Sequence, residues 1–170
     1  VVEELDELLL ASMQERTVEQ VGEEDAALQR PHHGRPNQHA RAQRGREEAR
    51  LIYQGVAHLL PQSDERRLVV DIGGRSTELI LGRNLDASAM ESFRVGSVAW
   101  SMKYFPDGQF TDQAFQIAEV AAKAVLDEAL NVYRPDAWDV AYGSAGTVNA
   151  ITEVLEAAGW EKGVITRAGL

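Results

Sequence analysis

The chain has 170 residues, 44% of them hydrophobic and 26% charged, with a formal net charge of −10. This size suits one globular domain or a piece of a larger protein. The excess of acids disfavours a broad interface with nucleic acid or anionic lipid, and the sequence has no apolar run long enough to span a membrane. The absence of cysteine excludes disulfides and thiolate metal sites, and it fits a cytoplasmic protein.

The first 44 residues differ in composition from the rest of the chain. Residues 1–29 hold nine acids and one arginine, and their apolar residues are spaced as on one face of a helix. Residues 30–46 hold five arginines, three histidines and no acid, which predicts an exposed linker. No carboxylate or cysteine nearby completes a metal site, so we expect the histidines of this linker to be solvated: His32, His33 and His39.

From Glu47 onward, the chain alternates between helical and strand patterns. Helical spacing of apolar residues predicts a helix over 47–60, with Glu47 and Glu48 in its first turn. The runs "LVVDIG" and "TELILG" are joined by a glycine loop, which predicts a β-hairpin, and "ESFRVGS" at 91–97 predicts a third strand.

The second half of the chain shows a further strand between helices. Helices are predicted at 97–105 and at 111–133, the second of them capped by Thr111. A fourth strand, "AWDVAYG", follows Pro135, and a helix from Ser144 is expected to stop at Gly159. A strand that returns after a long helix predicts a mixed sheet with helices packed on it.

The hairpin loop combines glycines and hydroxyls between two acids. Glycine allows a close approach to the backbone, so one anion could bind the N–H groups and hydroxyls of Gly73, Gly74, Ser76 and Thr77. Asp71 and Glu78 flank this loop and would repel a phosphate unless a hard cation lay between them, and Mg²⁺ suits such oxygen ligands. The alternative is an ordinary hairpin with polar ends, and the spacing leaves both interpretations open.

Two further stretches have both a functional and a purely structural interpretation. The turn "GSAGT" at residues 143–147 joins a strand to a helix, where free N–H groups can bind an anion. Small residues are also needed there for steric reasons alone. Glu47 and Glu48 fit caps that compensate the helix dipole, or one of them fits a base that deprotonates an attacking water.

Four segments together resemble the exopolyphosphatase and guanosine-pentaphosphate phosphohydrolase family of the sugar kinase, Hsp70 and actin superfamily. They occur in the family's order across residues 45–170: "GREEARLIYQGV", "LVVDIGGRSTELILG", "VGSVAWSMKYFPDG" and "DVAYGSAGTVNAITEVL". The resemblance implies an α/β fold of the ribonuclease H-like (actin-like ATPase) kind, a mixed sheet with flanking helices that is incomplete at both ends. It implies a hinge helix at 47–60 and a second-domain core at 67–170, preceded by an atypical region at 1–44.

The resemblance also implies hydrolysis of the terminal phosphate of inorganic polyphosphate or of the 5′ γ-phosphate of guanosine pentaphosphate, with Mg²⁺ as cofactor. By position, Glu48 matches the family's proposed catalytic base, and Asp71 and Glu78 match the acids that bind the metal. The phosphate-binding positions lie in the two glycine-rich turns: Gly73, Gly74, Arg75, Ser76, Thr77, Gly143, Ser144, Gly146 and Thr147. A homodimer is also considered, whereas nucleic acid and membranes are not expected partners.

The sequence departs from the family pattern in three places. The family's first phosphate loop, similar to D-x-G-S-N-S, has no counterpart, and the chain stops before the last strand and helices expected. Arg75 stands where the family usually has glycine. It would lend a cation to the bound phosphate, strain the loop if that position needed a positive φ, or fill the space of the phosphate, and a side chain at the loop tip can also point outward. These departures keep two alternatives open: a non-catalytic binder of polyphosphate or an alarmone, and an inactive truncated fragment.

Overall fold

The computed structural model of the chain describes residues 38–170, and the side chains of residues 38–42 and 44 are not part of the description. The helix expected at 1–29 and the histidines predicted to be solvated therefore fall outside the described residues and side chains. Among residues 38–170, no helix combines the length and apolarity that crossing a bilayer requires.

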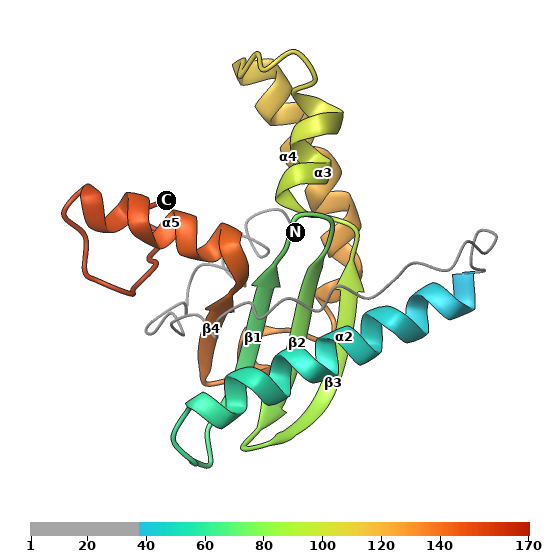
Figure 1. Cartoon of the computed structure of the whole chain (residues 1–170), viewed down its shortest axis with the longest axis vertical. Helices are drawn as coiled ribbons and strands as arrows, with labels where there is room; N and C mark the ends of the chain where they lie inside the picture. Colours follow the sequence, from blue (N-terminus) through green and yellow to red (C-terminus); the bar gives the residue numbers. More distant parts are fainter. Residues whose placement is uncertain (1–37) are drawn as a thin grey trace, which may run out of the picture.

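Four strands form one mixed sheet in the order β3-β2-β1-β4 (Figure 1). Strand β1 (Arg66–Ile72) pairs antiparallel with β2 (Thr77–Arg83), which pairs antiparallel with β3 (Asp86–Phe93). Strand β4 (Val140–Ser144) returns parallel to β1. The predicted hairpin and the predicted mixed α/β sheet are confirmed.

Helices cover both faces of the sheet. Helix α2 (Gln38–Leu59) lies across one face, where its buried side chains pack against Val69, Ile80 and Tyr142. The other face packs against the segment after α4 (Asp112–Leu126), in a cluster that includes Leu68, Leu79, Tyr133 and Trp138. Because β1 and β2 are buried on both faces, their apolar residues run continuously instead of alternating with polar ones.

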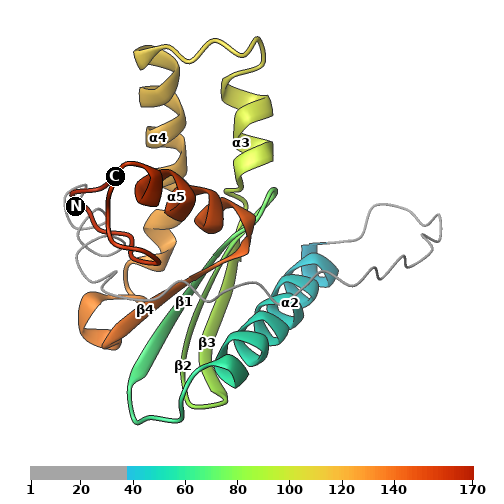
Figure 2. The same cartoon turned by 60° about the vertical axis from the view of Figure 1, so that its left-hand side comes forward.

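The remaining helices lie at the end of the sheet where β1 and β4 finish. Helix α5 (Ala145–Ala157) follows β4 directly and packs through Val148 and Leu155 against Ile165. Helices α3 (Ser97–Tyr104) and α4 lie side by side and extend beyond the sheet (Figure 2). The N-terminus of α3 therefore lies near the loop between β1 and β2, to which it is hydrogen bonded.

Helix α2 begins nine residues before the predicted start at Glu47, so residues 38–46 of the predicted linker are helical. This stretch is rich in alanine, arginine and glutamine, which are strong helix formers, but the neighbouring prolines and glycines hid that preference. Glu47 and Glu48 therefore lie in the middle of α2, and their interpretation as caps of its first turn is wrong.

Three other predicted boundaries also shift. The third strand runs from Asp86 to Phe93, not from 91 to 97, because β3 follows β2 through a tight turn at Asn84, whose φ is 52°. The helix predicted at 111–133 ends at Leu126 and gives way to 3₁₀ turns. Its predicted cap is confirmed, since the Ala114 N–H donates to Thr111 Oγ1 at 3.2 Å, and Gly159 ends α5 with a φ of 90°.

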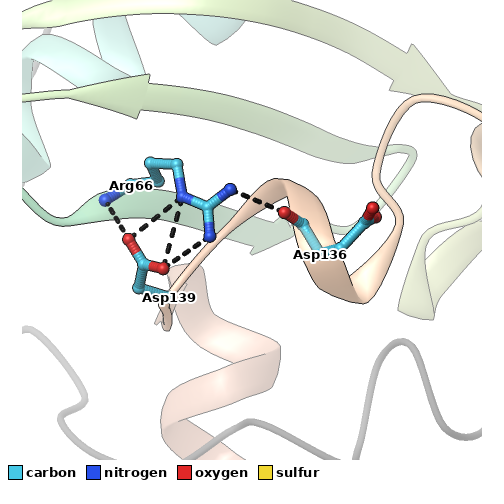
Figure 3. A network of polar contacts seen from close by, with 3 residues as sticks. All are labelled: Arg66, Asp136 and Asp139. Atoms are coloured by element: carbon cyan, nitrogen blue, oxygen red, sulfur yellow. Dashed lines mark hydrogen bonds and ion pairs between the residues drawn. The ribbon is translucent and has the colours of Figure 1, made fainter.

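An exposed polar network fixes the pairing of β1 with the segment that enters β4 (Figure 3). Arg66 Nη2 lies 2.6 Å from Asp139 Oδ1, the Arg66 main-chain N–H donates to Asp139 Oδ2 at 2.8 Å, and Arg66 Nη1 donates to the Asp136 carbonyl. These hydrogen bonds lower the pKa of Asp139 to about 2. Exposed ion pairs add little stability. The parallel pairing of β1 with β4 brings Asp71 opposite Ser144 at the far end of the strands.

The contact between α2 and β2 generates the first prediction. A Cβ built on Gly82 lies 2.2 Å from Tyr53 Cζ and 2.7 Å from the Asp86 carbonyl oxygen. We expect Gly82→Ala to lower the free energy of unfolding by about 1–3 kcal/mol, because the added methyl overpacks this contact. Urea unfolding followed by circular dichroism measures the change.

Gly55→Ala is the matched control. Gly55 is exposed on α2, the helix that carries Tyr53, and a Cβ there meets nothing within 4 Å. It should raise the free energy of unfolding by about 0.5–1 kcal/mol through helix propensity alone. Native stability in Gly82→Ala would contradict the close packing of Tyr53 on β2.

Candidate functional site

A row of four polar residues crosses the sheet at the end where α3 begins. Strand pairing places Ser92 of β3 opposite Glu78 of β2, Glu78 opposite Asp71 of β1, and Asp71 opposite Ser144 of β4. Side chains of paired residues point to the same face of a sheet, and Val69, two residues before Asp71, packs under α2. These four residues, here called the polar row, therefore lie on the face that α2 covers.

Two adjacent carboxylates occupy the centre of the polar row. Asp71 and Glu78 are only 9% and 2% exposed, and no described arginine or lysine forms an ion pair with either of them. Burial raises the pKa of Asp71, and a hydrogen bond from the Ser144 side chain partly offsets this rise. Ser92 Oγ donates to Glu78 Oε1 at 2.6 Å. The acids are thus held by hydroxyls at the two ends of the row and by no described cation.

Helix α2 brings Glu48 to the same face. The pKa of Glu48 is raised, first by partial burial and then by the negative charges of Glu78 and Asp71. Its neighbour Glu47 is oriented differently, because its carboxylate pairs with Arg50 at 2.7 Å and that contact lowers its pKa. Of the two adjacent glutamates, Glu48 is therefore the one that interacts with the polar row.

The hairpin loop, residues 73–76, uses some of its expected donors within the protein. The Gly73 N–H donates to the Ser76 carbonyl at 3.0 Å, and Thr77 Oγ1 donates to the Val95 carbonyl at 2.6 Å. Among the described residues, no hydrogen bond engages the main-chain N–H of Gly74 or Arg75 or the hydroxyl of Ser76. These three groups and the main-chain N–H of Ser76, which also has no hydrogen bond among the described residues, are the donors that the loop retains for an anion.

Arg75 lies at the tip of this loop with an exposed side chain. Its φ is outside the positive range, so the strain that the sequence raised as one alternative is absent. A Cβ built on Gly96 would lie 2.4 Å from the Arg75 carbonyl carbon, which shows how closely the start of α3 packs on the loop. The Ser97 N–H donates to the Gly73 carbonyl at 3.1 Å and the Ala99 N–H donates to the Gly74 carbonyl at 2.9 Å. The start of helix α3 therefore holds the loop through the carbonyl groups of Gly73 and Gly74.

The second glycine-rich turn, residues 143–147, lies beside the first. Thr147 Oγ1 donates to Ser97 Oγ at 3.0 Å, so the start of α5 is joined to the start of α3. Ser144 lies opposite Asp71 in the β1–β4 pairing, and its side chain lowers the pKa of Asp71. Gly146 is exposed at the N-terminal end of α5, where the helix dipole is positive.

Ala145 is a feature of this turn that the sequence analysis did not single out. Its φ is 71°, in the left-handed region that alanine rarely occupies. Strain of this kind is concentrated at functional sites. The only signal in the sequence was its place between a strand and a helix in "GSAGT".

The polar row fits a hard divalent cation. Mg²⁺ is commonly bound through one or two carboxylates, with waters and phosphate oxygens as its other ligands. Asp71 and Glu78 offer two adjacent buried carboxylates that lack a cationic partner within residues 38–170. No group of three or more histidine, cysteine, aspartate or glutamate residues with metal-site geometry occurs in this part of the chain.

The strain at Ala145 generates the second prediction. Because the left-handed region costs alanine about 1–2 kcal/mol and glycine almost nothing, Ala145→Gly should raise the free energy of unfolding by about 0.5–1 kcal/mol. Ala150→Gly, at an exposed position inside the same helix, should lower it by about 1 kcal/mol. Chemical unfolding compares the two variants, and equal destabilisation by both would argue against a strained turn.

The raised pKa of Asp71 generates the third prediction. The pKa of this carboxyl is 3.8 in the unfolded chain and higher in the folded chain. Between these two pKa values the folded chain binds more protons than the unfolded chain, so the stability contributed by Asp71 falls as the pH rises from one to the other. Asp71→Asn should therefore raise Tm at pH 7 without metal, with a smaller gain at about pH 4.

Two further measurements accompany this variant. Mg²⁺ should raise the Tm of the native chain and not that of Asp71→Asn, because ligands that bind the folded state stabilise it. Asp64→Asn, in an exposed turn, serves as the control and should show neither effect. If the Tm gain of Asp71→Asn were the same at both pH values, it would contradict the link between the ionisation of Asp71 and the stability of the chain.

Comparison with known proteins shows the family to which the chain belongs. A family model described as the Ppx/GppA phosphatase family matches residues 37–170. The guanosine-5'-triphosphate,3'-diphosphate pyrophosphatase of Photobacterium profundum is 45% identical over 126 residues, which are 74% of this chain and 25% of that relative. The chain thus spans about a quarter of the length of this curated relative.

Solved structures agree with the family match. The crystal structure of an exopolyphosphatase-like protein is 27% identical, with a TM-score of 0.59 over 66% of this chain and 38% of that chain. The type II variant of the Aquifex aeolicus Ppx/GppA phosphatase is 25% identical, with a TM-score of 0.53 over 68% and 36%. The match to the family model begins at residue 37, eight residues before the resemblance found in the sequence, and it includes the N-terminal half of α2. The chain therefore belongs to the Ppx/GppA phosphatase family and has the mixed sheet and flanking helices of its actin-like fold.

Proposed function

We propose that this chain forms part of a phosphohydrolase that acts on phosphoric anhydrides, with Glu48 as the general base and the polar row as the metal site. The substrate would be guanosine pentaphosphate or inorganic polyphosphate, cleaved at the terminal phosphate. The observation that carries the proposal is the convergence of three carboxylates from α2, β1 and β2, in which Asp71 and Glu78 raise the pKa of Glu48.

Glu48 has the properties that a general base needs. A base acts most efficiently when its pKa approaches the working pH, and burial together with the two neighbouring acids raises that of Glu48. No described cation pairs with its carboxylate, whereas Glu47 is neutralised by Arg50. Glu48 would accept the proton of a water that attacks the terminal phosphorus in line with the leaving oxygen.

Asp71 and Glu78 would hold Mg²⁺ at the floor of the site. When bound, Mg²⁺ would offset the negative charge of the phosphate oxygens. The acids are pre-positioned for this task because they are buried in neighbouring strands and each carboxylate has a hydroxyl partner. Preorganised groups of this kind need little rearrangement during the reaction.

The two glycine-rich turns would bind the phosphate oxygens. The donors retained by the first turn are the hydroxyl of Ser76 and the main-chain N–H groups of Gly74, Arg75 and Ser76, and the Arg75 side chain adds an exposed cation. Gly146 and Thr147 stand at the positive end of α5. Thr147 is joined to Ser97 and Ser97 to Gly73, so the turns would act as one surface.

The names of similar proteins support both substrates. The curated relative is named for a guanosine nucleotide and is 45% identical, whereas the exopolyphosphatase-like structure is 27% identical. Guanosine pentaphosphate is therefore the first substrate to assay and polyphosphate the second.

The fourth prediction tests the base. In the presence of Mg²⁺, Glu48→Gln should lower the rate of phosphate release by about 10²–10⁴-fold, the usual contribution of a general base. Substrate binding should persist, because the amide keeps the size of the side chain. Glu47→Gln is the matched control on the neighbouring residue and should keep most of the rate, since Glu47 pairs with Arg50 outside the site.

The same assay distinguishes the proposal from its rivals. Binding of polyphosphate or guanosine pentaphosphate by the native chain with no phosphate release would support a non-catalytic binder. Neither binding nor release would support an inactive fragment. Equal loss of rate in the two glutamine variants would remove the base assignment from Glu48.

A further inference from the structure

Ser92 is the one member of the polar row that lies outside the four segments that carry the family resemblance. It belongs to β3, the edge strand of the sheet, and neither glycine-rich turn contains it. Strand pairing alone brings it opposite Glu78.

The contact between Ser92 and Glu78 is short and charge-assisted. Ser92 Oγ donates to Glu78 Oε1 at 2.6 Å, within the range of a hydroxyl bonded to a carboxylate. Glu78 is 2% exposed, whereas Ser92 is an exposed residue. Among the described residues, no other hydrogen bond to the Glu78 carboxylate is present. The second oxygen, Oε2, is therefore the one without a hydrogen bond.

Ser92 also contacts the helix that carries Glu48. A Cβ built on Gly45 would lie 2.9 Å from Ser92 Cβ, so α2 packs directly on this residue. Gly45 and Glu48 are three residues apart and lie on neighbouring positions of one helical face. The side chain of Ser92 thus lies between the helix of the proposed base and a proposed metal ligand.

We propose that Ser92 is a positioning residue for the metal site, in that its hydroxyl fixes the rotamer of Glu78 and leaves Oε2 to bind the cation. This inference rests on the proposed function of Asp71 and Glu78. Hydrogen-bond partners of metal-binding carboxylates orient them, and their loss typically weakens metal affinity or activity by 10–100-fold. Ser144 has the corresponding contact with Asp71 at the other end of the row.

The test is Mn²⁺ binding to the full chain, measured by electron paramagnetic resonance, with Mn²⁺ as the spectroscopic substitute for Mg²⁺. Ser92→Ala removes the hydroxyl and keeps the Cβ that packs against Gly45. It should weaken Mn²⁺ binding by about tenfold or more, and its Tm without metal should fall, because a buried carboxylate loses its only hydrogen-bond donor among the described residues.

Ser88→Ala is the matched control on the same strand, because Ser88 Oγ donates to the Leu81 carbonyl and not to an acid. It should bind Mn²⁺ as the native chain does. Glu78→Gln sets the scale for loss of the ligand itself.

Each outcome decides a different point. Native affinity in Ser92→Ala, together with weakened binding in Glu78→Gln, overturns the role of Ser92 and leaves the proposed metal site intact. Absence of Mn²⁺ binding in the native chain overturns both. Equal weakening in Ser92→Ala and Ser88→Ala assigns the effect to β3 as a whole and also overturns the inference.

Discussion

Two buried carboxylates held side by side, with no described cation to neutralise them, are the constraint from which the rest of the site follows. Asp71 and Glu78 are direct partners in the β1–β2 pairing, so the backbone itself fixes their separation. Burial of like charges is unfavourable unless hydrogen bonds or a cation compensate for it. The hydroxyls of Ser92 and Ser144 supply part of that compensation. In the proposed function, a divalent ion bound between the two acids would supply the rest.

The other elements of the structure act on these two acids from outside the sheet. Helix α2 packs on Val69, Ile80 and Tyr142, and this apolar contact holds Glu48 at a distance from which the acids raise its pKa. Helix α3 fixes the hairpin loop through two main-chain hydrogen bonds, and Thr147 joins that assembly to α5. The apolar packing of α2 on the sheet therefore determines that Glu48 lies close enough for the acids to raise its pKa.

Local patterns were sufficient where neighbouring residues decide the structure. The two apolar runs around "GGRS" predicted the hairpin, and hairpin pairing brings Asp71 opposite Glu78 without any long-range information. The cap at Thr111 and the stop at Gly159 were also found, since a side-chain oxygen and a positive φ act within a few residues. The start of α2 was missed because prolines and glycines just upstream outweighed the helix formers of 38–46. The length of α4 was overestimated because the apolar pattern continues past Leu126 into segments that pack on the sheet as 3₁₀ turns.

The sequence by itself determined the hairpin, its two acids, the glycine-rich turns and the family resemblance, because each of these is written in a contiguous stretch. Only the tertiary structure decided that Glu48 interacts with the acids while Glu47 does not, since that depends on the rotation of α2 over the sheet. The same holds for the hydroxyl partners of the acids. Ser92 reaches the polar row through the β2–β3 hairpin, whose strand β3 lies earlier in the chain than the sequence predicted. Ser144 reaches it through a parallel pairing that joins residues far apart in the chain, and no local pattern encodes the register of such a pairing.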